Sequence, residues 1–222
     1  MAQPKVEMRQ VELQKLITPN PRSDLIVEGI QMVSGLLLVL FLWVHMLFVA
    51  SIWLGSNAFN TLANFMNRYG LVWVTVVFLV LVIGSHVGAV VRRIPKQFRE
   101  QRIIWRHAKL IRHMDTWSWI FQSITGAALL ALAIIHVVVV TYGGISTQIS
   151  STRVFNHFLI FYIVLLLLAE YHASVGLYRI FVKWGWVSQH SLHRVLGVIT
   201  VLTVGIGAVS LYVFYALGAQ FV

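Results

Sequence analysis

Four histidines and one glutamate stand inside long apolar stretches of the chain. They are His45, His86, His136, His172 and, two residues before the last of these, Glu170. An ionisable side chain in the hydrocarbon core of a membrane is costly, which makes each of them a candidate functional residue. Neutral imidazole is a common ligand of transition metals, and a buried carboxylate can take up and release protons. The pattern therefore predicts a redox or metal centre at the histidines and proton transfer at Glu170.

The composition is typical of an integral membrane protein. Of the 222 residues, 59% are hydrophobic and 11% are charged, whereas soluble domains are about 45–50% apolar and about 25% charged. Cysteine is absent, which excludes disulfides, thiolate-bound iron–sulfur clusters and covalently attached haem. The net charge of +10 does not indicate nucleic-acid binding, because membrane proteins collect Lys and Arg in their cytoplasmic segments.

Five apolar segments are long enough to cross a bilayer, which requires ~20 residues. We predict spans at about 28–54, 69–91, 116–142, 156–182 and 191–217. A polar segment, 1–27, precedes them without a cleavable signal, and a loop rich in asparagine follows the first span. Residues 92–115 interleave arginine with apolar side chains, which is typical of a basic amphipathic segment on the membrane surface. We therefore expect one all-α membrane domain, 1–222, with five transmembrane helices in a bundle.

Basic residues are distributed unevenly between the two ends of this bundle. Of the 17 Lys and Arg, all but Arg68 and Arg153 lie on the side that holds the N-terminus and the 92–115 segment. By the positive-inside rule this side, including the N-terminus and the basic amphipathic segment, is cytoplasmic.

The four buried histidines then sort into two layers. At a rise of ~1.5 Å per residue, His45 and His136 lie ~9–14 Å below the outer ends of their spans, and His86 and His172 lie ~24 Å below them. A haem with two histidine ligands needs opposed imidazoles on facing helices. The layers therefore predict two haems in the bundle, although a single membrane histidine could also serve in helix packing.

Two similar dipeptides support the inner layer. Ser34-Gly35 and Thr125-Gly126 each precede an outer-layer histidine by ten residues, which is ~15 Å of helix. Both glycines should therefore lie near the inner layer, where a missing side chain would let a flat macrocycle approach the backbone. Small residues also favour ordinary helix packing in membranes, so this signal stays ambiguous by itself.

Several longer strings carry a resemblance to a known family. They are Leu-Trp-Val-His45-Met-Leu-Phe-Val, Arg92-Arg-Ile-Pro95, His113-Met-Asp-Thr-Trp-Ser-Trp119, Glu170-Tyr-His-Ala-Ser-Val-Gly-Leu-Tyr-Arg and Val182-Lys-Trp-Gly-Trp186. In these strings, and over nearly its whole length, the chain resembles the dihaem cytochrome b membrane subunit of bacterial quinol:fumarate reductase (succinate:quinone oxidoreductase), in its single-chain, five-helix form.

The resemblance implies roles for particular residues. His45 and His136 would ligate the iron of a distal haem B, and His86 and His172 the iron of a proximal one. The residues implied in contacts with the haem propionates are Gln31, Trp119, Arg153 and Lys183. Glu170 would belong to a transmembrane proton pathway that moves protons inward alongside electrons.

The resemblance also implies the partners and the reaction. Menaquinol would be oxidised in the membrane, and electrons would pass to an iron–sulfur subunit on the cytoplasmic face and then to a flavoprotein with FAD. Fumarate would there become succinate, or the reverse. The protein would sit in the lipid of a bacterial inner membrane and serve anaerobic respiration, with no role in nucleic-acid binding. The oligomeric state is open, a dimer of heterotrimers being one candidate.

One departure from the family and two other functions stay open. The family carries a glutamate near the start of the second span, whereas residues 60–70 contain no acid here. His157, a haem propionate or water would have to accept the quinol proton, or the quinone site would lie elsewhere. The chain could also be the cytochrome b subunit of a periplasmic hydrogenase or formate dehydrogenase, although its basic surface faces the cytoplasm. A small transporter or structural anchor is the non-redox alternative.

Overall fold

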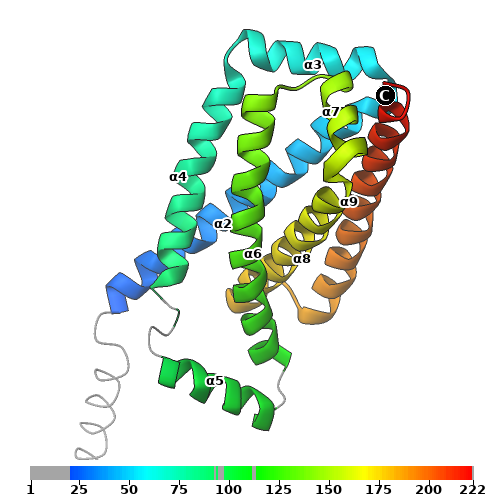
Figure 1. Cartoon of the computed structure of the whole chain (residues 1–222). Helices are drawn as coiled ribbons and strands as arrows, with labels where there is room; N and C mark the ends of the chain where they lie inside the picture. Colours follow the sequence, from blue (N-terminus) through cyan, green and yellow to red (C-terminus); the bar gives the residue numbers. More distant parts are fainter. Residues whose placement is uncertain (1–20, 93, 95–97, 112–113, 222) are drawn as a thin grey trace, which may run out of the picture.

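The computed structural model describes residues 21–92, 94, 98–111 and 114–221. Within these ranges all regular structure is helical (Figure 1). A bilayer core offers no water to backbone groups, and helices satisfy those groups internally. Most of the predicted N-terminal segment, and positions 93, 95–97 and 112–113 of the basic connection, lie outside the described residues.

In the described part of the chain, five helical segments are long and apolar enough to cross a membrane, which confirms the predicted fold class. They are α2 (Pro21–Ala50) with the 3-10 turn η1 (Ser51–Leu54), α4 (Leu71–Val91), α6 (Met114–Gly143), α7 (Thr147–Arg153) with the π-helical turn η2 (Val154–Phe158) and α8 (Leu159–Lys183), and α9 (Gln189–Gly218). The fourth of these segments begins at Thr147, earlier than the predicted residue 156, because α7 and η2 continue into α8.

The connection after the first span is a helix, α3 (Ser56–Arg68), so the prediction of a loop was wrong. Phe59, Ala63 and Met66 recur at helical spacing, and the first two are almost fully buried. Phe59 packs against Phe48 and Phe214, with ring centroids 5.5 and 5.2 Å apart. The asparagines masked this amphipathic pattern, because their low helix propensity indicates a loop when it is read without the packing.

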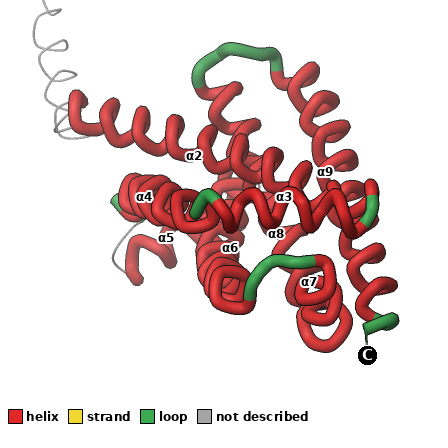
Figure 2. The backbone as a smooth tube through the Cα atoms, turned by 90° about the horizontal axis from the view of Figure 1, so that it is seen from above, coloured by secondary structure: helices red, strands yellow, loops and turns green. Residues whose placement is uncertain are grey.

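The helices associate mainly in pairs. α2 packs against α4, and α8 packs against both α6 and α9. α3 lies across one end of the bundle, whereas α5 (Phe98–Ile111) lies at the other end (Figures 1 and 2). Close approach of α9 to α8 depends on Gly207, where a Cβ would lie 2.6 Å from Leu166. The result is a bundle in which the α2/α4 pair and the α6/α8 pair face each other.

Candidate functional site

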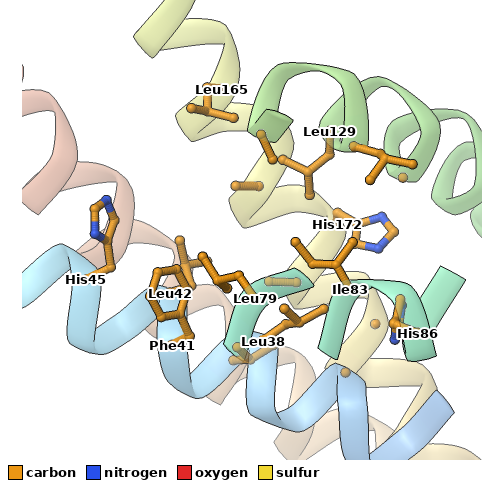
Figure 3. Close-up of a pocket in the computed structure, with 18 of the residues that line it drawn as sticks. Leu38, Phe41, Leu42, His45, Leu79, Ile83, His86, Leu129, Leu165 and His172 are labelled. Atoms are coloured by element: carbon orange, nitrogen blue, oxygen red, sulfur yellow. The ribbon is translucent and has the colours of Figure 1, made fainter. Parts of the chain in front are cut away.

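A cavity of about 1120 Å³ is lined by residues from both of these helix pairs. Typical small-molecule sites measure about 300–1,000 Å³, so this cavity suits more than one ligand or an unusually large one. All four histidines of the apolar spans line it. Figure 3 shows His45 at one end and His86 with His172 at the other, and leucine and isoleucine side chains between them.

The cavity end nearest α3 holds His45 of α2 and His136 of α6. Their ring centroids lie 5.8 Å apart and the ring planes meet at 73°. A metal–imidazole bond of about 2.0–2.1 Å on each side gives a centroid separation of ~6 Å for two opposed ligands of one metal. Phe41 stacks on His45, and Tyr162 meets His136 edge-on. This separation would let the two imidazoles hold one metal between them.

The other end of the cavity holds His86 of α4 and His172 of α8. A hydroxyl on the neighbouring helix lies beside each Nδ1: Ser34 Oγ at 3.1 Å from His86, and Thr125 Oγ1 at 3.4 Å from His172. These contacts leave the second ring nitrogen, Nε2, as the candidate ligand atom. Each imidazole pair thus combines one side chain from α2/α4 with one from α6/α8.

The two glycines of the Ser34-Gly35 and Thr125-Gly126 dipeptides lie against the inner imidazoles. A Cβ at Gly35 would lie 3.3 Å from Cε1 of His86, and a Cβ at Gly126 would lie 2.8 Å from Cε1 of His172. The expected depth of the glycines is therefore confirmed. The expected reason was incomplete, because the edge of the imidazole, rather than a macrocycle alone, needs the missing side chain.

All four residues predicted to contact propionates line the cavity: Gln31, Trp119, Arg153 and Lys183. Lys183 also forms an ion pair with Glu28, a partner that the sequence did not suggest. The amide oxygen of Gln31 is buried and has no hydrogen-bond partner among the described residues. A buried polar atom that faces a cavity is suited to contact a polar group of a ligand.

Sequence reasoning missed Gln122, a polar residue inside the apolar third span. Its Nε2 donates a hydrogen bond to the backbone carbonyl of His172 (3.0 Å), and its Oε1 has no hydrogen-bond partner in the described part of the chain. Gln122 lies one turn before Thr125 on the cavity side of α6. The signal was available, since an uncharged amide within a membrane span needs a hydrogen-bond partner.

Arg153 reaches the cavity because the helix that carries it changes its winding. The cavity face of α8 includes Tyr162, Ala169 and His172. Arg153 lies nine residues before Tyr162, which in an unbroken α-helix is about 2.5 turns and therefore the opposite face. The π-helical turn η2 between them takes up one additional residue, a shift of about 100°. Arg153 then turns towards the cavity and donates from Nη2 to the carbonyl of Gly144 (3.0 Å).

Glu170 lies at the contact between α8 and α9 and does not line the cavity. It is 2% exposed. Its Oε1 accepts hydrogen bonds from Ser174 Oγ and Thr200 Oγ1, each at 2.9 Å, and those two hydroxyls lie 2.7 Å apart. Its Oε2 has no hydrogen-bond partner among the described residues. The two-residue offset from His172 thus points the carboxylate and the imidazole to different neighbours, as the sequence predicts for successive helix faces.

Residues 60–70, where the family carries a glutamate, include a polar side chain that connects two helices. Asn60 Oδ1 accepts hydrogen bonds from the backbone N–H (2.8 Å) and the hydroxyl (3.1 Å) of Thr147, which ties α3 to α7. His157, the alternative proton acceptor, is exposed on η2. The geometry does not bring an acidic side chain into this part of the described chain.

Comparison with known proteins places the chain among respiratory membrane subunits. Residues 99–209 match the family described as succinate dehydrogenase/fumarate reductase transmembrane subunit. The chain is 32% identical over 194 residues to the fumarate reductase cytochrome b subunit of Helicobacter pylori, with 81% of this chain and 76% of the relative covered. It is 35% identical over 170 residues to the fumarate reductase cytochrome b subunit of Wolinella succinogenes, with 70% of this chain and 65% of that protein covered.

The contact between Glu170 and Thr200 can be tested by a double-mutant cycle. Thr200→Val keeps the shape of the side chain but removes one hydroxyl donor, and a lost hydrogen bond to a buried group costs about 1–3 kcal/mol. We expect a lower unfolding temperature in detergent for Thr200→Val, and a smaller effect of the same change in a Glu170→Leu background. Thr61→Val is the matched control, because that exposed hydroxyl bonds only the carbonyl of Asn57. Equal losses in both backgrounds would contradict the contact.

Proposed function

The chain belongs to the family of succinate dehydrogenase/fumarate reductase transmembrane subunits, and from this premise we propose its function. It is the membrane anchor and electron-transfer subunit of a quinol:fumarate reductase. It binds two b-type haems and carries electrons from menaquinol to iron–sulfur and flavin subunits, or in the reverse direction.

One observation supports this proposal above the others: opposed histidines lie across one long cavity. His45 and His136 are already at the separation that a shared metal requires. His86 and His172 lie at the opposite end of the cavity, and a hydroxyl of the neighbouring helix lies beside Nδ1 of each ring. Histidines used only for helix packing would not need a cavity beside their rings, whereas all four of these line one cavity. We therefore assign the first pair to a distal haem and the second to a proximal one.

The remaining residues have roles that follow from their places in the structure. Each haem, when bound, would supply one-electron transfer between the two ends of the cavity. Gln31, Trp119 and Lys183 would hold propionates at the α5 end, and Arg153 would do so at the α3 end. Glu170 would hold and release a proton at Oε2, the carboxylate oxygen that lacks a partner among the described residues. The hydroxyls of Ser174 and Thr200 on Oε1 would fix its orientation.

The partner subunits would dock at the α5 end. α5 carries Arg99, Arg102, Arg106 and Lys109, and a concentration of basic residues marks the cytoplasmic side. Oxidation of menaquinol releases two electrons and two protons, and reduction of fumarate consumes the same numbers. The chain has no cysteine for iron–sulfur clusters, so those clusters and FAD would belong to the partner subunits. Protons carried inward past Glu170 would balance the electrons that cross the membrane.

Difference spectra test the haem assignment directly. We expect the purified chain to show reduced-minus-oxidised b-type absorbance from two haems. His136→Ala should lose the distal component and His86→Ala the proximal one, because each change removes one of the two imidazoles that would hold that haem. His157→Ala, on the exposed surface of η2, is the matched control and should retain both. Absence of b-type absorbance, or unchanged spectra in both ligand variants, would exclude the proposal.

Two assays separate a role of Glu170 in proton transfer from a structural one. Glu170→Gln retains the size and the hydrogen-bonding capacity of the side chain but cannot release a carboxyl proton. We expect turnover of the complex with menaquinol to fall by roughly 10²–10⁴-fold, the usual contribution of a proton-transfer group. Both haems should stay bound, and fumarate reduction by a soluble one-electron donor should stay normal. An equal loss in the two assays would indicate a structural role instead.

The charge of Arg153 should raise the reduction potential of the distal haem, since a nearby cation favours the reduced form. We expect a lower distal potential in Arg153→Gln and a smaller fall in Gly143→Ala, where the new Cβ would lie 2.6 Å from Nη2 of Arg153 and displace it. Gly84→Ala is the control, because a Cβ there meets no atom within 4 Å. Redox titration gives both potentials, and an unchanged distal value in Arg153→Gln would refute this role.

A further inference from the structure

Both inner histidines are contacted in the same way by the helix with which their own helix is paired. Ser34 of α2 lies 3.1 Å from Nδ1 of His86 on α4. Thr125 of α6 lies 3.4 Å from Nδ1 of His172 on α8. In each case the next residue is a glycine whose missing side chain leaves room for Cε1 of the same ring. In both helix pairs, therefore, a hydroxyl residue followed by glycine forms the surface that contacts the inner imidazole.

The direction of these hydrogen bonds follows from the single proton of each hydroxyl. Ser34 Oγ donates to the carbonyl of Ile30 (2.6 Å), and Thr125 Oγ1 donates to the carbonyl of Phe121 (2.8 Å). A Ser or Thr hydroxyl has one hydrogen to donate and lone pairs to accept with. Since the hydrogen of each is engaged within its own helix, the hydroxyl must accept from the imidazole. Nδ1 of each ring then carries the proton, and Nε2 is left without one.

A second carbonyl of the same helix lies near each hydroxyl. Ser34 Oγ lies 3.2 Å from the carbonyl oxygen of Gln31, and Thr125 Oγ1 lies 3.2 Å from that of Gln122. A carbonyl can only accept a hydrogen bond, so these neighbours also favour donation of the hydroxyl hydrogen within its own helix.

The outer pair lacks this arrangement. Nδ1 of His136 is buried and has no hydrogen-bond partner among the residues that the structure describes. The ring instead meets the edge of Tyr162, with centroids 5.6 Å apart. His45 stacks on Phe41 of its own helix. Aromatic contacts restrict the tilt of a ring but do not select which nitrogen carries the proton.

We propose that Ser34 and Thr125 are positioning residues for the proximal haem: they fix His86 and His172 as Nδ1–H tautomers, which leaves Nε2 of each ring unprotonated and available to hold the haem iron. This inference rests on the proposed function. A group that accepts a hydrogen bond from the N–H of a metal-bound imidazole fixes the orientation of the ring and makes the imidazole a stronger electron donor to the metal. Stronger electron donation favours ferric iron, so these hydroxyls lower the reduction potential of the proximal haem.

Paired substitutions test the proposal in the full chain. Ser34→Ala and Thr125→Val remove the acceptors, whereas Ser34→Thr and Thr125→Ser keep them. We expect the first two to raise the midpoint potential of the proximal haem and to broaden its low-spin ferric EPR signal, with the distal haem unchanged. The two hydroxyl-retaining variants should resemble the unsubstituted protein. Ser85→Ala is the matched control, because that hydroxyl also bonds a carbonyl of its own helix but is exposed.

A second measurement does not need the haem. In the haem-free chain, ¹⁵N NMR of labelled histidines should show His86 and His172 as Nδ1–H tautomers, and Ser34→Ala should shift His86 towards a mixture. An unchanged proximal haem and an unchanged tautomer in both variants would overturn the proposal. Equal shifts of both haems would do the same, since they would indicate a general disturbance of the bundle. Absence of haem from the unsubstituted chain would instead refute the proposed function.

Discussion

Each buried imidazole in an apolar bundle must satisfy two ring nitrogens, and the architecture of the site depends on this requirement. Membrane interiors offer no water to complete the hydrogen bonds of a polar group, so the neighbouring helix has to do so. For His86 and His172 it does so through a hydroxyl that is itself bonded within its own helix. Pairing of α2 with α4 and of α6 with α8 is therefore part of the site and not only of the scaffold.

The two helix pairs carry hydroxyl, glycine and histidine residues in the same arrangement. The first helix of each pair carries the hydroxyl–glycine contact for the inner layer and, ten residues later, an outer-layer histidine. The second helix carries the inner-layer histidine. Each pair thus contributes one imidazole to each end of the cavity, and a ligand with two opposed positions must bridge the pairs. Binding at both ends would join α2/α4 to α6/α8, because ligand binding stabilises the folded state in which both halves of the site are present.

α8 directs two candidate functional side chains to different neighbours by rotation alone. His172 faces the cavity, whereas Glu170 faces α9 and bonds Thr200. Two residues of helix are a rotation of about 200°, with a rise of only about 3 Å. The carboxylate that we propose to carry protons can therefore lie at nearly the same depth as a proposed iron ligand and still face a different neighbour. The proposed coupling of proton and electron movement needs this closeness, since charge separation across a membrane opposes further electron transfer.

The sequence by itself determined the membrane class, the presence of five candidate spans and the sorting of four histidines into two pairs. Apolar length and helical rise run along a single segment, so they can be counted without knowledge of its neighbours. The same reasoning predicted the ligands and Glu170 as functional residues, and the resemblance predicted the propionate contacts. The comparisons establish the family, whereas the roles of these individual residues stay predictions.

Only the tertiary structure decided what lies beside each residue. The segment 56–68 is a helix, α3, because Phe59 packs against the bundle. Arg153 lines the cavity because the π-helical turn η2 changes the direction in which it points. Gln122 is a lining residue of the cavity that was not predicted. The tertiary structure also placed the hydroxyls of Ser34 and Thr125 beside Nδ1 of His86 and His172. Lateral contacts depend on how each helix is rotated and which helix it faces. Periodicity within one helix does not contain that information, because rotation about the axis leaves the sequence pattern unchanged.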